Sequence, residues 1–194
     1  LVRLDDIRGD FHVHTNATDG RYSLKKMVNA AKEKGYDYVA ISDHSKRVSV
    51  ANGLDEKRLR EQMDEIDNLN SELKNFKVLK SIEVDILKDG LLDLPDDVLK
   101  DLDLVIASVH YYQDLSKKKQ TKRILKAMDN PNLNILGHPT GRIIGKRGPF
   151  EMDLERIMEA AKEKSCFLEI NAQPDRLDLS DIHVKMAREL GIKL

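Results

Sequence analysis

The sequence contains little cysteine and no long apolar stretch. Its 194 residues include one cysteine, Cys166, which cannot form a disulfide within the chain, so we expect a reducing, cytoplasmic setting. No apolar run approaches the roughly 18 residues that a membrane-spanning helix needs, and no signal-peptide pattern is present. These absences exclude a disulfide-stapled domain and a membrane-spanning protein, and membrane partners are not expected.

The chain also has little net charge and few aromatic residues. The formal net charge is only -1, so there is no overall attraction to nucleic acid, and any such binding must use local basic patches. The four Phe and five Tyr are spread thinly, although Tyr111 and Tyr112 adjoin His110. No aromatic platform for stacking bases stands out, and base-specific readout is not expected.

What the chain does contain is a regular alternation of strand-like and helix-like segments, without repeats or low-complexity tracts. Ser23 is placed to cap the first helix and Gly35 to end it. Repeated βα units imply parallel strands with right-handed crossovers, in a doubly wound sheet or a barrel. The expected strands cover residues 10–14, 36–44, 77–86, 103–110, 133–139 and 166–171, and the expected helices 24–34, 55–73, 95–102, 117–128, 154–164 and 180–190.

Both ends of the chain suggest a piece of a longer polypeptide. It begins with Leu1 rather than Met, and "IKL" after Gly191 looks like the start of a seventh strand. We therefore interpret residues 1–194 as a single domain, taken from a larger protein and truncated before its last βα unit.

Five of the six histidines lie on or just after predicted strands. His12 and His14 alternate with Val13, so their side chains should point the same way, about 7 Å apart along the strand. Donors also stand at the ends of later strands, and the carboxyl ends of parallel strands form the rim where active sites assemble. The expected metal ligands are His12, His14, Asp19, His44, Glu83, His110 and His138.

Each of these residues alone is also consistent with a structural role. Donors at the ends of four successive strands with apolar interiors favour a metal site, whereas His183, in the middle of a helix, is interpreted as an ordinary surface residue. Imidazole with carboxylate suits Zn, Mn or Fe, and seven donors indicate two or three ions with a bridging carboxylate. The leading chemistry is phosphoester hydrolysis by a metal-bound hydroxide, with no catalytic side chain assigned; amidohydrolase chemistry is the alternative.

The motifs "HVHT", "ISDHS", "SIEVD", "SVH" and "GHPTGR" together resemble the PHP (polymerase and histidinol phosphatase) superfamily of metal-dependent phosphoesterases. The longer segments "DIRGDFHVHT" and "GHPTGRIIGKRG" are similar to the C-terminal PHP domain of family X DNA polymerases. This resemblance implies a distorted (β/α)7 barrel, TIM-barrel-like, with a trinuclear site bridged by Glu83. It also implies a Mn-dependent 3′–5′ exonuclease in DNA repair, joined to a polymerase domain. The family's last motif, Asp-x-His on the seventh strand, is absent from this chain.

Basic residues near the rim are candidates for holding a DNA strand or 3′ end. Arg142 is the favoured ligand for a substrate phosphate, because a guanidinium fork matches it, and Lys46 and Asn171 are further candidates for substrate binding. The run after His110 and the group after His138 are also candidates, although a solvated charged surface is the favoured explanation of the lysine run. The run after His110 contains Lys117, Lys118, Lys119, Lys122 and Arg123, and the group after His138 contains Lys146 and Arg147. Arg47, just after His44, is a further candidate.

Three functions remain open at this point. The first is a nuclease that attacks the terminal phosphodiester of DNA, and the second is a small-molecule phosphomonoesterase of the histidinol-phosphatase type. The third is a non-catalytic structural domain of a polymerase. None of the seven ligand positions is replaced, which argues against a decayed site.

Overall fold

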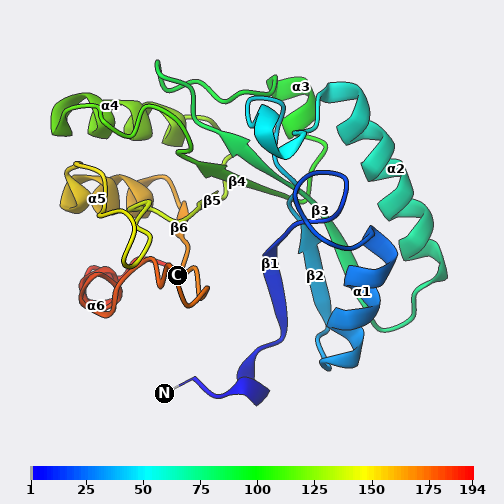
Figure 1. Ribbon diagram of the computed structural model, residues 1–194. Helices are drawn as coiled ribbons and strands as arrows, with labels where there is room; N and C mark the ends of the chain where they lie inside the picture. Colours follow the sequence, from blue (N-terminus) through cyan, green and yellow to red (C-terminus); the bar gives the residue numbers. More distant parts are fainter. Residues whose placement is uncertain (1) are drawn as a thin grey trace. The chain divides into compact units, whose positions relative to one another are not determined.

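The computed structural model describes residues 2–194, which form two compact units (Figure 1). Unit 1 comprises the chain up to Glu83 together with Leu94–Val105, and unit 2 comprises Val84–Asp93 and Ile106–Leu194. None of the helices in the described range has both the length and the apolar composition needed to cross a bilayer.

Unit 1 is built on three parallel strands in chain order. β2 lies between β1 and β3, with Asp10 opposite Val39 and Val39 opposite Val78. The strands are β1 (Gly9–Val13), β2 (Tyr38–Ile41) and β3 (Lys77–Asp85), whose last two residues belong to unit 2. The helices are α1 (Leu24–Glu33), α2 (Glu56–Glu72) and α3 (Asp96–Leu99), with short 3-10 helices at Leu4–Asp6 and Ser49–Ala51.

The core of unit 1 follows from the amphipathic pattern of its helices. Leu24, Val28 and Ala31 recur at helical spacing on α1 and are buried against the apolar strands β2 and β3. The Ser23 side chain accepts a hydrogen bond from the Lys26 amide at the start of α1, as its sequence predicts. The amino-terminal cap and the buried face of α1 are therefore those that the sequence predicts.

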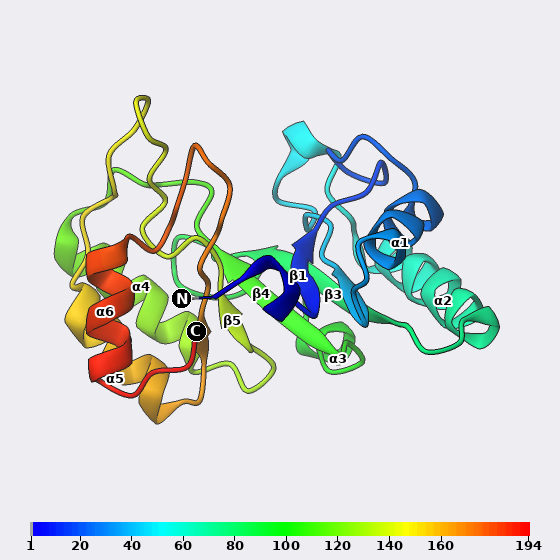
Figure 2. The same ribbon diagram turned by 90° about the horizontal axis from the view of Figure 1, so that it is seen from below.

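Unit 2 repeats this arrangement with β4 (Leu104–Ser108), whose first two residues belong to unit 1, β5 (Ile135–Leu136) and β6 (Phe167–Leu168). These strands are parallel and in chain order. Its helices are α4 (Lys117–Met128), α5 (Leu154–Glu163) and α6 (Asp181–Glu189), seen from a second direction in Figure 2. After α6, the Leu168 amide donates to the Lys193 carbonyl at 3.1 Å. The last residues thus meet β6 where a further strand was predicted to begin, although the described residues contain no seventh strand.

Several strands are shorter than predicted, and β5 and β6 are the shortest. The apolar runs 133–139 and 166–171 form only two strand residues each. The ladder ends because His138, at a φ of 25°, donates its amide to the Glu169 carboxylate rather than to a neighbouring strand. The predicted α/β class of parallel βα units is nevertheless confirmed.

Cys166 is buried just before β6. It is 3% exposed, and burial raises the pKa of its thiol from 9.0 to about 12. We expect no reaction with a disulfide reagent at pH 8 in the native protein, and reaction of one thiol after unfolding in urea. Since the unfolded thiol ionises first, its contribution to stability should be complete below pH 9.0 and decline towards about 12. Rapid labelling of the native protein would contradict this burial.

Candidate metal centre

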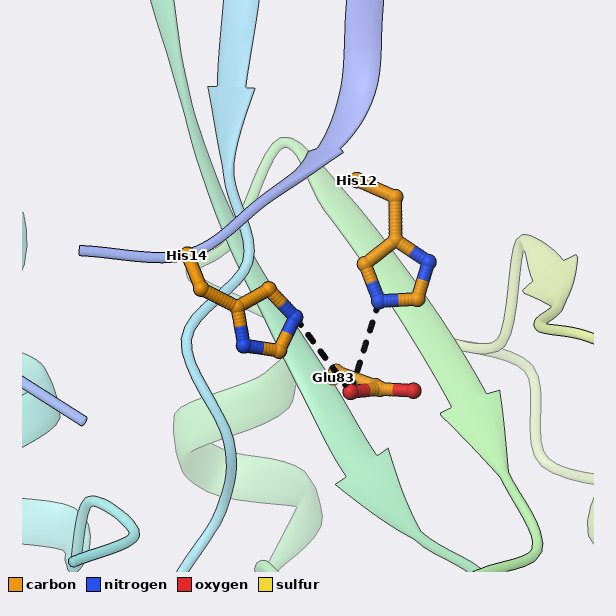
Figure 3. A group of neighbouring side chains, drawn as sticks. All are labelled: His12, His14 and Glu83. Atoms are coloured by element: carbon orange, nitrogen blue, oxygen red, sulfur yellow. Dashed lines mark ion pairs between the residues drawn. The ribbon is translucent and has the colours of Figure 1, made fainter. Parts of the chain in front are cut away.

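The centre begins with two histidines at the end of β1. Their rings stack with centroids 5.2 Å apart at an interplanar angle of 22°. Figure 3 shows both imidazoles pointing to Glu83 of β3. His12 Nε2 lies 3.3 Å and His14 Nε2 3.4 Å from the same Glu83 oxygen, Oε2. Alternation along β1 thus directs two nitrogen donors to one carboxylate that is only 1% exposed.

His44 and Asp19 complete the cluster in unit 1. His44, just after β2, places Nδ1 2.9 Å from Glu83 Oε2 and Nε2 3.4 Å from Asp19 Oδ2. Asp19 also hydrogen-bonds through Oδ1 to His14 Nδ1 at 2.9 Å. One Glu83 oxygen therefore faces three imidazoles, and the Asp19 carboxylate faces two.

Asp19 is held in its ionised form. The hydrogen bond from His14 lowers the pKa of Asp19 from 3.8 to about 2, and the charges of His14 and His44 act in the same direction. Partial burial opposes this, but the side chain remains 50% exposed. Because the folded pKa is depressed, the stabilisation is complete above 3.8 and is lost as the pH falls through about 2.

A buried aspartate shapes the loop that carries Asp19. Asp43, fully buried after β2, accepts hydrogen bonds from the Thr15 amide at 2.8 Å and the Thr15 hydroxyl at 2.6 Å. It also accepts from the Thr18 hydroxyl and from Gln62 Nε2 of α2. Gly20 closes the loop, since a Cβ there would lie 2.5 Å from the His14 carbonyl oxygen. Asp43 lies near the end of the strand predicted over residues 36–44, but its role in holding this loop was not predicted.

Arg58 of α2, which was not predicted, also supports this loop. Its guanidinium donates to the carbonyls of Ala17, Asn52 and Gly53 at 2.7 to 3.0 Å. It therefore ties the Asp19 loop to the segment before α2. In the sequence, the helix-capping Asp55 followed by Arg58 three residues later does not indicate this contact.

Unit 2 brings together the remaining two histidines that were predicted as metal ligands, His110 and His138. The rings of His110 and His138 have centroids 5.3 Å apart at 74°. Asp85, buried at the end of β3, accepts from the His110 amide at 3.1 Å and lies 3.2 Å from His110 Nδ1. Glu169, which was not predicted, accepts from the His138 amide. A carboxylate thus contacts each histidine, at the amide and the ring of His110 and at the amide of His138.

The donors in unit 1 fit a metal ion by type and spacing. Two groups, His12–His14–Glu83 and His14–Asp19–His44, each place their ligand atoms within 4.8 Å of one another. Imidazole nitrogen with carboxylate oxygen is the donor set typical of Zn, Mn and Fe. The two groups share His14, and Glu83 of the first group also contacts His44 of the second, so a carboxylate connects the two sets of donors.

The three predicted substrate residues already have protein partners. Arg142 donates to the carbonyls of Arg176 and Leu177, and Lys46 pairs with Glu56, which lowers the pKa of that carboxyl. Asn171 accepts from the Gln173 amide at 3.2 Å. Their contact with a substrate stays a prediction.

Two sequence predictions in unit 2 were wrong. Arg123 was a candidate for binding phosphate, but it is 2% exposed, and it donates to the carbonyls of Leu87, Tyr111 and Ile86. It shares the inner face of α4 with Ile124 and Ala127, a pattern that could have revealed its burial. His183 was predicted to be a surface residue, but it is half-buried. Of the described potential metal-binding groups, none includes His183.

The chain belongs to the PHP domain family, whose model matches residues 10–173. It is similar to a Lactococcus lactis histidinol phosphate phosphatase, solved with zinc, L-histidinol and phosphate. The TM-score is 0.65 at 21% identity, covering 96% of this chain and 83% of that one. The predicted distorted, TIM-barrel-like PHP fold is thereby confirmed as a class.

Two relatives found by sequence similarity extend this comparison. The chain is 45% identical over 194 residues to the DNA polymerase/3'-5' exonuclease PolX of Bacillus subtilis, covering 100% of this chain and 34% of that protein. It thus spans about a third of that relative's length. It is 30% identical to a probable phosphatase of Thermoanaerobacter sp. (strain X514), over 95% of this chain and 75% of that protein. Family and relatives together support a metal-dependent phosphoesterase of the phosphatase type.

Proposed function

We propose that this chain is a metal-dependent 3′–5′ exonuclease domain that processes DNA ends in repair. In this proposal it is covalently attached to a family X DNA polymerase and works in the cytoplasm. The phosphoesterase part of this proposal rests on one observation: a single Glu83 oxygen lies 2.9 to 3.4 Å from nitrogens of three histidines. The 45% identity to a polymerase with a named 3'-5' exonuclease supports DNA as the substrate.

All seven donors predicted from the sequence are proposed as metal ligands. Five come together in unit 1, with Glu83 as the bridge, and His110 and His138 come together in unit 2. Two or three ions of Mn or Zn, or of Fe, suit this donor set. When bound, such ions polarise the phosphoryl group and provide a nucleophile at neutral pH.

The residues of the chain supply charge and orientation for this chemistry. Asp19, ionised at every pH well above about 2, is ready to bind a cation without first losing a proton. Asp85 orients the His110 ring, and Asp43 fixes the loop before Asp19. Arg142, Lys46 and Asn171 are proposed to contact the substrate, and each would have to exchange a protein partner for it.

The test is digestion of a 5′-labelled single-stranded DNA by the chain loaded with Mn²⁺, with His14→Ala alongside. We expect a ladder of products shortened from the 3′ end, and its loss in His14→Ala, because His14 contacts both Glu83 and Asp19. An identical ladder from the variant would identify a contaminating nuclease. Retained far-UV circular dichroism shows that the variant is folded.

A small-molecule phosphatase is the second candidate. It is favoured by the similarity to probable phosphatases, of which the chain covers 75%. Turnover of histidinol phosphate alongside the oligonucleotide, with the same protein and the same metal, separates the two. Phosphate release from the small ester with an intact DNA strand would replace the nuclease proposal. No turnover of either, with metal bound, would support a non-catalytic domain.

A further inference from the structure

Helix α4 begins with charges that oppose its own dipole. Lys117, Lys118 and Lys119 occupy its first turn, which contains no acidic residue. The amino end of a helix carries partial positive charge, so cations there are unfavourable and carboxylates are preferred. Helix stability does not explain this choice of residues.

A groove of about 840 Å³ runs along this helix and α5, which pack side by side (Figure 1). Lys118, Lys122 and Lys126 are spaced by four residues and form a row along α4, with a rise of about 6 Å from one to the next. Arg156 adds a cation from α5. The groove is lined by Lys117, Lys118, Thr121, Lys122, Leu125, Lys126, Asp129, Asp153 and Arg156.

The two carboxylates that line the groove interact with groups other than the lysine row. Asp129 pairs with Lys164 at 2.9 Å, and Asp153 caps α5 by accepting from the Arg156 amide. Within residues 2–194, no ion pair joins a carboxylate to Lys118, Lys122 or Lys126. The row therefore presents uncompensated positive charge in a protein whose net charge is -1.

The opposite face of the same helix is anchored next to a proposed metal ligand. The buried Arg123 guanidinium donates to the Tyr111 carbonyl at 2.8 Å and, through Nε, to the Leu87 carbonyl at 2.8 Å. Tyr111 directly follows His110. A strand held in the groove would thus lie on a helix that is fixed to the His110 loop.

We propose that the groove between α4 and α5 binds the sugar–phosphate backbone of a DNA strand. This proposal rests on the proposed nuclease function and names the surface that would hold its substrate. Uncompensated lysines in a row suit a linear polyanion, and the groove lining contains no aromatic side chain for base stacking. Binding is therefore independent of sequence and weakens steeply with salt.

The test compares K118Q/K122Q/K126Q with K25Q/K32Q/K34Q, which removes three exposed lysines in and after α1. Binding of the whole chain to fluorescein-labelled oligo(dT) is followed by anisotropy in EDTA over a range of salt. We expect the α4 variant to bind on the order of tenfold more weakly and its salt slope to fall by about 2. The α1 variant should bind like the wild type.

A second variant, Lys117→Glu, distinguishes a specific loss of DNA binding from a loss of folding. It should raise the melting temperature by improving the helix dipole while weakening DNA binding, an opposite pair of effects that a misfolded protein cannot produce. Equal binding by the wild type and the α4 variant, or no binding by the wild type, would overturn the proposal. So would α4-dependent binding of polyglutamate without binding of oligo(dT), which would indicate an acidic protein partner.

Because EDTA prevents metal-dependent cleavage, the groove and the nuclease proposals can fail separately. A chain that binds oligo(dT) through α4 but never shortens it with Mn²⁺ loses the nuclease assignment and keeps the groove. Digestion that is equal in the wild type and the α4 variant, with equal binding, keeps the nuclease and rejects the groove.

Discussion

A Glu83→Gln variant is expected to lose bound metal and phosphoesterase activity together. The substitution keeps the size of the side chain but removes the charge that His12, His14 and His44 face at 2.9 to 3.4 Å. A neutral amide cannot balance a divalent cation or bridge two of them in the same way. We expect activity to fall at least about 100-fold, which is at or beyond the upper end of losses seen for residues that only orient a ligand.

Metal content after Mn²⁺ loading and dialysis, measured by mass spectrometry, is the direct readout. His183→Gln is the matched control, because it removes a half-buried imidazole that belongs to none of the described potential metal-binding groups. It should retain metal and activity. Full metal content in Glu83→Gln would show that Glu83 does not bridge ions. Loss of metal in His183→Gln would show that the metal site extends to residues outside the described groups.

Asp43→Ala should cause the largest loss of stability among the residues around the site. Asp43 is fully buried and accepts from Thr15, Thr18 and Gln62, so its removal leaves buried donors without an acceptor. Hydrogen bonds to a charged group contribute about 1.5 to 3 kcal/mol each, and we expect unfolding to become easier by about 3 kcal/mol or more.

Urea unfolding followed by circular dichroism measures this loss. Asp37→Ala is the control, because it breaks an ion pair with Arg8 in which both side chains are at least half exposed. Exposed pairs of this kind contribute between about 0 and 1 kcal/mol. A change for Asp43→Ala no larger than for Asp37→Ala would mean that the loop before Asp19 is held by other contacts, with Arg58 the first to test.

Much of the fold was predictable because it depends on local patterns. The bounds of α4, Lys117–Met128, agree with the helix expected from periodicity, and Ser23 caps α1 as predicted. The ends of β5 and β6 were not predictable, since His138 donates to a carboxylate 31 residues away. Periodicity contains no information on such a partner.

The same distinction holds for the site. Glu83 was predicted as a metal ligand and Asp43 was not, but position at a strand end does not by itself distinguish Glu83, which faces three histidines, from Asp43, which faces hydroxyl and amide donors. Both follow or end an apolar strand. Which groups face a carboxylate depends on the neighbouring strands and loops.

By itself, the sequence determined the order of the βα units, the apolar faces of the helices and the residue types available as metal donors, because each follows from spacing along the chain. Only the tertiary structure decided that Asp19 is shared by two histidines, that Arg123 is buried, and that three lysines of α4 line a groove without compensating carboxylates. These outcomes depend on contacts between residues distant in sequence. Such contacts form only when neighbouring helices, strands and loops pack against one another.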